Sequence, residues 1–195
     1  MNRSASALAQ LDLSIDCSIR IRESTRRDLR DLEWYGIFWS QRALIEEAWE
    51  RHRRGENLML LAEYHGFPIG QVWVDLARGR THCVGLLWAL RVFPLFQGHG
   101  LGTALVAAAE RCLLERDVEL AEIGVEKNNP DARRLYERLG YHVTGDNRQV
   151  SHYTTPDGRR RRMRISEWIL RKALSDASIV RVAGGDRALR MAAAS

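Results

Sequence analysis

Short strand-like segments and longer amphipathic segments follow one another along most of the chain. The strand-like segments are apolar or alternate between polar and apolar positions, and turns such as His65-Gly66-Phe67-Pro68 separate them. Seven strands are predicted in this way, at residues 18–22, 57–64, 69–76, 82–92 and 120–126, from Tyr141 onward, and at about 161–170. A Pro156-Asp157-Gly158 turn is expected to join the last two strands.

Four segments between the strands have the apolar spacing of helices. Thr25 and Ser40 are of the residue types that cap helix starts. Asn129-Pro130 is a typical start of a helix, and Gly140 a typical end. The apolar positions that predict the four helices are Leu29 and Leu32 after Thr25, with Glu33 beside them; Ala43, Leu44, Ala48 and Trp49 after Ser40; Leu101, Leu105, Ala108 and Cys112 within 100–116; and Ala132, Leu135, Tyr136 and Leu139 after Asn129.

The length of 195 residues is that of one domain, and the 45% hydrophobic and 28% charged residues are close to globular averages. Strands and helices alternate within residues 18–174, which we predict to be this domain, of mixed α/β class. Residues 1–17 are expected to be a flexible N-terminal segment. Residues 175–195 lack a clear period and are expected to be a C-terminal tail.

Several classes of protein are excluded by what the sequence lacks. The longest apolar run, Cys83–Leu90, is far shorter than the roughly 20 residues of a membrane-spanning helix. The first 13 residues contain no apolar stretch of the length that a secretory signal needs. The three cysteines are far apart and form no CxxC pair. We therefore expect a soluble, cytoplasmic protein with neither a disulfide framework nor a bound metal.

Positive charge is concentrated in the last third of the chain. The net charge is +5, with 16 basic and 18 acidic residues in 1–130 but 14 basic and 7 acidic in 131–195. Arginines at 159–162 and 164, followed by Arg171 and Lys172, could bind the phosphates of nucleic acid or of a phosphate-rich ligand. A solvent-exposed edge strand explains the same residues. Nucleic-acid binding through this strand is therefore the weaker alternative.

A glycine-rich turn follows the predicted strand 82–92 and leads directly into a helix. Gly98, Gly100 and Gly102 occupy alternate positions in it. Free backbone amides at a helix N-terminus bind phosphate when glycines let the ligand approach closely. The Gly-Lys-Ser/Thr of the Walker A loop is absent, and Thr103 stands where GxGxxG needs its third glycine. An ordinary tight turn would explain the glycines as well, so a second motif is needed.

Two motifs together resemble the GNAT superfamily of N-acetyltransferases. Residues 90–103 contain Leu-x-Val-x-Pro followed by Gln-x-x-Gly-x-Gly, which is similar to the acetyl-CoA motif of that family. Residues 129–141 are similar to its Asn-x-x-Ala-x-x-Leu-Tyr-x-x-x-Gly-Phe segment, with Tyr141 in place of Phe. The motifs stand in the family's order with a strand between them. The resemblance covers roughly residues 18–174, and its specific part is 90–141.

This resemblance implies a three-layer fold that binds acetyl-CoA as co-substrate. The central sheet would be mixed, mostly antiparallel and of about seven strands, splayed between the strands that end at Val92 and Glu126. The pantetheine arm is expected on free backbone groups of Leu90 and Val92, with the Leu90 amide facing the thioester oxygen. The implied cofactor-binding residues are Leu90, Arg91, Val92, Gln97, Gly98, His99, Gly100, Leu101, Gly102, Thr103, Asn129 and Tyr136. The pyrophosphate would bind the amides of 98–103, so Gln97 and His99 are expected to be positional.

The resemblance also assigns Tyr136 as the catalytic acid that protonates the leaving thiolate, although Tyr136 shares the apolar helix face and could be a core residue. Asn129 could bond the pantetheine or simply cap its helix. Where some members keep a glutamate base, this chain has Leu86, Leu87 and Trp88. Neither motif places a cysteine or serine beside a base, so direct attack in a ternary complex is expected. The remaining candidates for the general base are Asp75, Glu126, Glu33, His82 or water.

The acceptor is expected to be a primary amine of a small molecule or peptide. The aromatic loop Trp34–Trp39, the strand around Trp73 and the hairpin after Tyr141 would build its site, and Glu46 and Glu47 could attract a cationic amine. A non-catalytic acyl-CoA-binding sensor or interaction domain is the alternative that keeps the fold. The resemblance also allows a homodimer.

Overall fold

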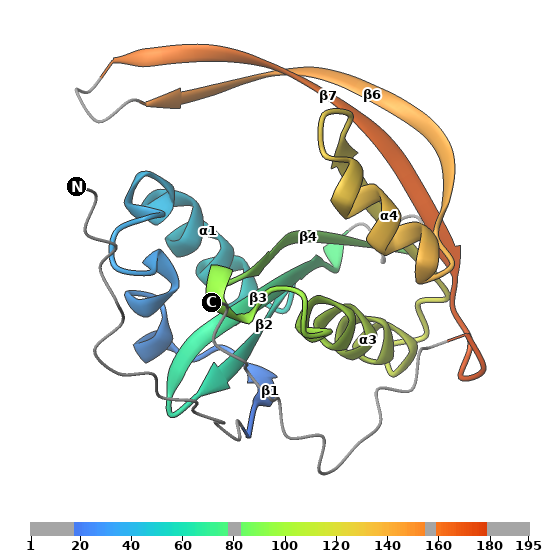
Figure 1. Ribbon diagram of the computed structural model, residues 1–195, viewed down its shortest axis with the longest axis horizontal. Helices are drawn as coiled ribbons and strands as arrows, with labels where there is room; N and C mark the ends of the chain where they lie inside the picture. Colours follow the sequence, from blue (N-terminus) through green and yellow to red (C-terminus); the bar gives the residue numbers. More distant parts are fainter. Residues whose placement is uncertain (1–17, 78–82, 155–158, 179–195) are drawn as a thin grey trace, which may run out of the picture.

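A computed structural model describes residues 18–77, 83–154 and 159–178. Its strands form one sheet in the order β1-β2-β3-β4-β5-β7-β6, and among hydrogen-bonded neighbours only β4 and β5 run parallel (Figure 1). The strands are β1 (Arg20–Glu23), β2 (Asn57–Tyr64), β3 (Phe67–Asp75), β4 (Val84–Val92), β5 (Leu120–Glu126), β6 (His142–Thr154) and β7 (Arg160–Ala173). The predicted fold class is therefore confirmed, and β2 and β5 have their predicted bounds.

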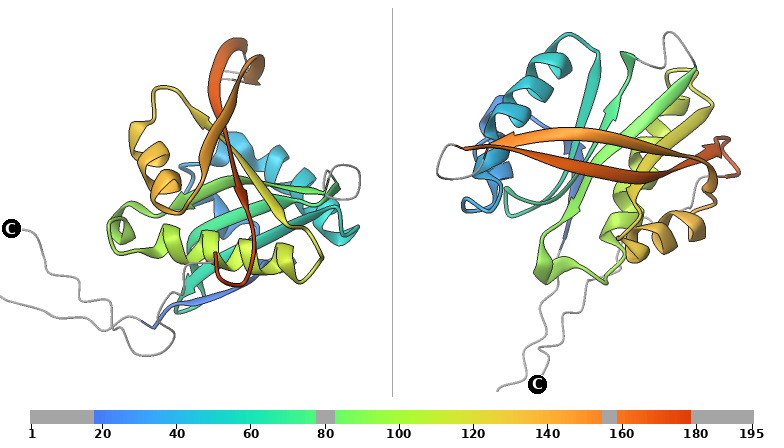
Figure 2. Two further views of the ribbon diagram at one scale, coloured as in Figure 1. Left: turned by 90° about the vertical axis from the view of Figure 1, so that its right-hand side faces the viewer. Right: turned by 90° about the horizontal axis from the view of Figure 1, so that it is seen from above.

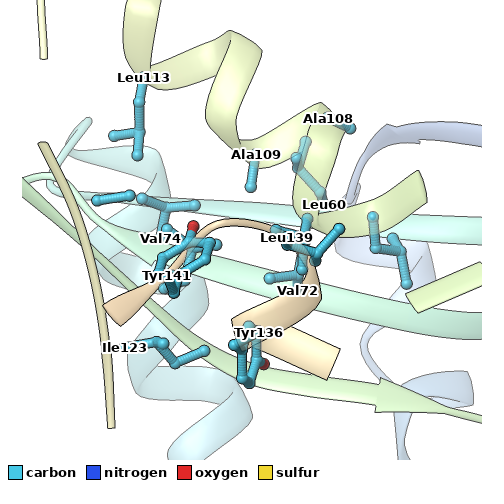
Figure 3. Close-up of a cluster of buried hydrophobic side chains, with 14 of the residues drawn as sticks. Leu60, Val72, Val74, Ala108, Ala109, Leu113, Ile123, Tyr136, Leu139 and Tyr141 are labelled. Atoms are coloured by element: carbon cyan, nitrogen blue, oxygen red, sulfur yellow. The ribbon is translucent and has the colours of Figure 1, made fainter. Parts of the chain in front are cut away.

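Helices cover both faces of this sheet. The side chains of α1 (Arg42–Arg53) pack with Met59 and Trp73, whereas those of α3 (Leu101–Leu114) pack with the alternate residues of the same strands, such as Val72. Since successive side chains of a strand point to opposite faces, the two helices lie on opposite sides. The helix α4 (Pro130–Arg138) adds Tyr136 to the larger cluster, on the α3 side (Figure 3).

The helix predicted after Thr25 is wrong in type. Two short 3-10 helices occur instead, η1 (Arg26–Asp28) and η2 (Asp31–Glu33). Asp28 accepts hydrogen bonds from the Thr25 amide and hydroxyl and from both terminal nitrogens of Arg22, which fixes the chain at its first turn. Beyond η2, Trp34, Tyr35 and Gly36 all have positive φ, so a longer helix cannot form.

The helix predicted after Ser40 exists but begins later. Ser40 lies within the 3-10 helix η3 (Trp39–Gln41), and Gln41 precedes the first residue of α1. The buried face of α1 is formed by Ile45 and Ala48, whereas the predicted Leu44 is exposed.

The sheet opens between β4 and β5. Four residue pairs join these strands, from Val84 with Leu120 to Leu87 with Ile123. Beyond them β4 has a bulge, at which the register with β3 shifts and Ala89 adopts a φ of +51°. On its other side β5 stays paired with β7 as far as Glu126. The predicted splay between the strands that end at Val92 and Glu126 is therefore present.

The last two strands form a long antiparallel arm. They pair from His142 with Arg171 to Thr154 with Arg160, well past the end of β5. Figures 1 and 2 show this arm reaching across the molecule, with its far end over the part that holds α1. It thus lies above the end of the sheet where β4 and β5 separate.

Some predictions fall on residues that the structure does not describe. They are the N-terminal segment 1–17, the candidate base His82, the turn Pro156-Asp157-Gly158 and most of the tail 175–195. Within the described ranges, no helix combines the length and the apolar character needed to cross a bilayer.

Candidate active site

The end of β4 presents backbone groups to the opening of the sheet. The Phe93 amide donates to the Ile69 carbonyl (2.8 Å), so by the alternation of an antiparallel ladder the backbone groups of Val92 point away from β3. The expectation that both groups of Val92 are free is corrected, because Gln97 Nε2 donates to the Val92 carbonyl (2.9 Å). Gln97 therefore has a positioning contact, as expected, and joins the loop to the strand.

The glycine loop exposes the amides of a helix start. A short 3-10 helix, η4 (Pro94–Phe96), leads into Gly98 and Gly100, whose φ values are +78° and +83°. A Cβ at either glycine would meet open space, so a ligand can approach the backbone there. No side chain caps α3, and its first backbone bond runs from the Ala104 amide to the Gly100 carbonyl (3.0 Å). The amides of Leu101, Gly102 and Thr103 are thus unused by the helix.

Electrostatics favour an anion at this point. The positive end of the dipole of α3, a helix of 14 residues, coincides with those amides. The His99 side chain is exposed and the Leu101 side chain is buried in the core, so the backbone rather than the side chains faces a ligand. The structure brings all predicted residues from Leu90 to Thr103 into one continuous edge beside the opening of the sheet.

Tyr136 is a buried residue of α4. Its side chain is 3% exposed and packs edge-to-face against Tyr141, with ring centroids 5.7 Å apart (Figure 3). Burial raises the pKa of the Tyr136 phenol well above its usual value. The phenol is therefore protonated throughout the physiological pH range and can donate a hydrogen bond or a proton, but it cannot act as a base.

Asn129 is the N-cap of α4. Its Oδ1 accepts a hydrogen bond from the Ala132 amide (3.1 Å), which is the structural role expected of an asparagine at this position. The side-chain oxygen is thus engaged, and a contact with pantetheine would be left to the side-chain NH₂ group.

The candidate bases are not brought to the open end of β4. Asp75 pairs with Leu86 at the closed end of the ladder, and its carboxylate contacts Arg51 Nη2 (2.9 Å). Glu33 accepts two hydrogen bonds from Arg42 (2.6 and 2.8 Å), which lower the pKa of that carboxyl and make it a poorer base. Glu126 is exposed, three residues past the last pair of β4 with β5. Of the described candidates, only Glu126 is on a strand that borders the opening.

The thiols do not offer a nucleophile. Cys83 is exposed at the start of β4, at the closed end of the ladder. Burial raises the pKa of the half-buried Cys112 thiol on α3, which disfavours the reactive thiolate. Among the described cysteines, neither combines activation with a place at the opening.

The predicted aromatic loop is split between two environments. Trp34 is 3% exposed and packs edge-to-face on Phe38 (5.3 Å) and Phe93 (5.4 Å). Tyr35 is 85% exposed and stacks on Phe67 (5.1 Å). A pocket of about 370 Å³ lies beside this stack and is lined by Tyr35, Tyr64, His65, Phe67, Ile69, Phe93 and Phe96. The loop therefore contributes both to the core and to an aromatic pocket.

Glu46 is not free to attract an amine. It forms an ion pair with Arg26 and borders a hollow of about 410 Å³ together with Arg26, Leu29, Arg30, Glu33, Arg42 and Ile45. Three arginines and two glutamates line this hollow, so its charge does not favour a cation.

The basic residues after the arginine-rich strand are also engaged. Arg171 bonds Glu122 (2.8 Å), and Lys172, 5% exposed, bonds both oxygens of the buried Glu110 (2.8 and 2.9 Å). Lys172 is therefore not available to a phosphate, and Arg171 is paired with a carboxylate. Arg162 and Arg164 are exposed on β7, as a solvated strand requires.

The side chain of Arg91, a residue predicted to bind the cofactor, lies on the α1 face of the sheet, and its neighbour Gln71 was not predicted from the sequence. The Arg91 guanidinium lies 4.2 Å from the centre of the Phe38 ring and bonds Gln41. Burial lowers the pKa of Arg91. Gln71, its partner across β3 and β4, is 1% exposed. The available signal was a polar residue within each of two otherwise apolar strands.

Comparison with known proteins gives the family. Residues 22–141 match the acetyltransferase (GNAT) family. The chain belongs to this family. It is 34% identical over 117 residues to a mycothiol acetyltransferase of Beutenbergia cavernae, a match that spans 60% of this chain and 34% of that protein. The chain thus spans about a third of the length of this relative. An uncharacterized N-acetyltransferase of Archaeoglobus fulgidus is 30% identical over an alignment of 134 residues, and the match covers 60% of this chain and 89% of that protein.

Solved structures of GNAT proteins share the fold. The ribosomal-protein-alanine N-acetyltransferase of Brucella melitensis superposes with a TM-score of 0.63 at 21% identity, covering 80% of this chain and 99% of that one. The yncA protein of Salmonella typhimurium, solved with its cofactor acetyl-CoA, has a TM-score of 0.61 at 19% identity, with coverages of 82% and 95%. The GNAT fold that the resemblance implies is therefore confirmed.

Proposed function

We propose that this GNAT protein is an N-acetyltransferase that moves an acetyl group from acetyl-CoA to a primary amine. The observation that carries the proposal is the opening between β4 and β5 beside the free amides at the start of α3. Membership of the GNAT family and the structural likeness to a protein solved with acetyl-CoA support it.

Acetyl-CoA would bind by backbone contacts. The pyrophosphate would accept hydrogen bonds from the amides of 98–103, where glycines at 98 and 100 leave open space. The pantetheine arm would extend along β4 past Val92 and Leu90. Because Gln97 Nε2 occupies the Val92 carbonyl, this side chain would have to move aside or bond the arm itself. Asn129 would contribute its NH₂ group.

The transfer itself would be a direct attack. The neutral amine nitrogen forms a bond to the thioester carbonyl carbon, the carbon–sulfur bond breaks, and the thiolate takes a proton. Tyr136 is the proposed donor of that proton. The nitrogen gives up its surplus proton to water, from which the proton donor is restored. Burial raises the pKa of the Tyr136 phenol and makes it a weaker acid. Desolvation would also raise the pKa of the CoA thiol in the same place, so the thiolate would be a stronger base and could still take the phenol proton. The Leu90 amide would stabilise the carbonyl oxygen.

The amine must reach the site without its proton. Of the described candidate bases, Asp75 and Glu33 are held by arginines away from the opening, and only Glu126 is on a strand that borders it. We therefore propose that water carries this proton away and that Glu126 is the candidate to receive it. A cytoplasmic location and a homodimer stay predictions.

The test is calorimetric titration with acetyl-CoA of three proteins: the unchanged chain, Gly100→Glu and Gly66→Glu. Both glycines have a φ near +80° and open space at Cβ, so the two variants carry similar backbone strain. Only Gly100→Glu places a carboxylate at the proposed phosphate site. It is expected to weaken binding by about 100-fold or more, whereas Gly66→Glu binds normally. Equal affinities of the two variants would refute the site.

Turnover is then measured as release of free thiol with a panel of primary amines. Acetylated product identified by mass spectrometry supports the enzyme. Binding of acetyl-CoA with no turnover of any amine would favour the sensor instead.

A further inference from the structure

One face of the sheet holds a group of buried polar atoms that lack hydrogen-bond partners. The buried atoms without a partner are Oε1 and Nε2 of Gln71, Nη1 of Arg91 and the indole nitrogens of Trp73 and Trp34. Among the described residues they are five of the seven such side-chain atoms. The group is therefore concentrated in one place.

These side chains lie together on the face that carries α1. Gln71 and Arg91 are directly opposed in the ladder of β3 and β4, so their Cβ atoms are separated by about 5 Å on one face. Trp73 is two residues further along β3 and shares that face. Phe38 connects Trp34 to the group, because the Trp34 ring packs against the Phe38 ring and the Arg91 guanidinium lies over that same ring.

Apart from Ser24 Oγ and Tyr141 Oη, the other buried side-chain polar atoms of the described residues have partners. Lys172 bonds Glu110 on the other side of the sheet, and Asn57 accepts a bond from the indole of Trp88 (3.1 Å). A buried donor without a partner is costly, so proteins rarely leave several in one place unless a ligand completes them. Within the described chain, the group around Gln71 and Arg91 is thus the place where unpartnered buried atoms are concentrated.

The chemistry of the group calls for an anion. Four of the five atoms are hydrogen-bond donors, and one of these belongs to a cation. In the described part of the chain Arg91 is bonded by the neutral amide of Gln41 and contacts no carboxylate. A carboxylate is acceptor-only and matches the planar guanidinium.

The location ties this group to the proposed reaction. Arg91 directly follows Leu90, whose amide would face the thioester oxygen, and its side chain points to the face opposite α3. We propose that the acceptor amine carries a carboxylate, which Arg91 binds with the help of the Gln71 amide. This inference rests on the proposed function and narrows the acceptors to amino-acid-like amines.

The test compares amines that differ only in the carboxylate. L-phenylalanine is paired with phenethylamine and L-leucine with 3-methylbutylamine, and kcat/KM is measured by thiol release. The unchanged protein is expected to favour the amino acid of each pair by about 10- to 100-fold, the range of a charge-assisted bidentate contact.

Three variants identify the residues responsible. Arg91→Met removes the charge and is expected to abolish the preference. Gln71→Glu supplies a carboxylate from the protein itself, so it is expected to abolish or reverse the preference while Arg91 is still present. Arg116→Met is the control, because Arg116 is an exposed arginine just beyond the C-terminal end of α3, outside the proposed acceptor site. Circular dichroism and acetyl-CoA titration establish that each variant is folded and binds the co-substrate.

Binding provides a readout that needs no turnover. N-acetyl-L-phenylalanine and N-acetylphenethylamine are titrated into the protein with and without CoA. The inference is supported if N-acetyl-L-phenylalanine binds more tightly than N-acetylphenethylamine and if Arg91→Met removes this difference. That result would hold even if acetyl-CoA does not bind and the proposed function is refuted. Equal binding and equal turnover of the paired compounds, or a preference that survives in Arg91→Met, would overturn the inference and leave the acetyltransferase intact.

Discussion

The ion pair between Lys172 and Glu110 leads to a quantitative prediction about stability. The Lys172 side chain is 4% exposed and that of Glu110 is 1% exposed, and Nζ bonds both carboxylate oxygens. Lys172→Met removes the cation and keeps most of the volume, so the Glu110 carboxylate would be buried without compensation. Breaking a buried pair in this way costs about 3–5 kcal/mol. That is a large part of the roughly 5–15 kcal/mol by which a domain is stable.

The double variant separates the charge from the packing. In Lys172→Met with Glu110→Leu neither charge remains, and replacing a buried pair by apolar residues is often neutral or stabilising. We therefore expect the double variant to lie within about 1.5 kcal/mol of the unchanged protein, although each single variant costs several kcal/mol. Arg133→Met is a matched control at the exposed pair with Glu137 and is expected to cost under about 1 kcal/mol.

Urea unfolding followed by tryptophan fluorescence and circular dichroism at neutral pH measures all four variants. Two results would refute the reasoning. A cost below about 1 kcal/mol for Lys172→Met would mean that the carboxylate is not isolated by the loss of its partner. A double variant as unstable as the sum of the single variants would mean that the two side chains contribute independently.

Three further predictions concern catalysis, packing and pH. Tyr136→Phe is expected to lower kcat about 100-fold with little change in acetyl-CoA affinity, measured by thiol release and calorimetry; unchanged kcat would leave Tyr136 as a core residue. Gly85→Ala would place a Cβ 2.3 Å from Leu113 Cδ2 in the packed core, so urea unfolding should show a loss of about 1–3 kcal/mol; Gly145→Ala, whose Cβ meets nothing within 4 Å, is the control and should change little. Burial alone would raise the pKa of Asp28, but hydrogen bonds from Arg22 and Thr25 lower it below its usual value. Hydrogen bonds from Arg22 and Arg20 likewise lower the pKa of Glu63. The stabilisation from these two carboxylates is present above their usual pKa values near 4 and is lost as the pH falls through and below them. Urea midpoints between pH 6 and pH 3 should therefore decline less in Arg22→Gln than in the unchanged protein.

Local signals were sufficient for much of the fold. The apolar runs of β2 and β5 are bounded by polar turns, so their limits could be predicted from the sequence. The cap of α4 by Asn129 is likewise a local interaction. The glycine loop could be predicted because glycine is the residue that most readily adopts positive φ, as Gly98 and Gly100 do. Its proposed role, binding of the pyrophosphate by backbone amides, requires no particular side chain.

What could not be predicted depends on contacts between distant residues. Arg22 is held by the distant Glu63 of β2, and in this position it also bonds Asp28, a contact that favours a tight 3-10 turn over the expected helix. Gln71 and Arg91 become neighbours only through the register of two strands, one of which contains a bulge. Lys172 and Glu110 are 62 residues apart, so the sequence shows only a basic residue after a basic strand.

The four pairs that join β4 to β5 have a mechanical consequence. The sheet consists of one half with β1 to β4 and another with β5, β7 and β6, and these pairs are the only ladder between the halves in the described chain. The helix α3 is a second link, because it packs under β3 and β4 and holds β7 through Glu110. A molecule lying in the opening would be a third link. Acetyl-CoA bound between β4 and β5 would therefore stabilise the arrangement of the two halves of the sheet. Hydrogen exchange of the backbone amides at the open ends of β4 and β5 should slow when acetyl-CoA is bound.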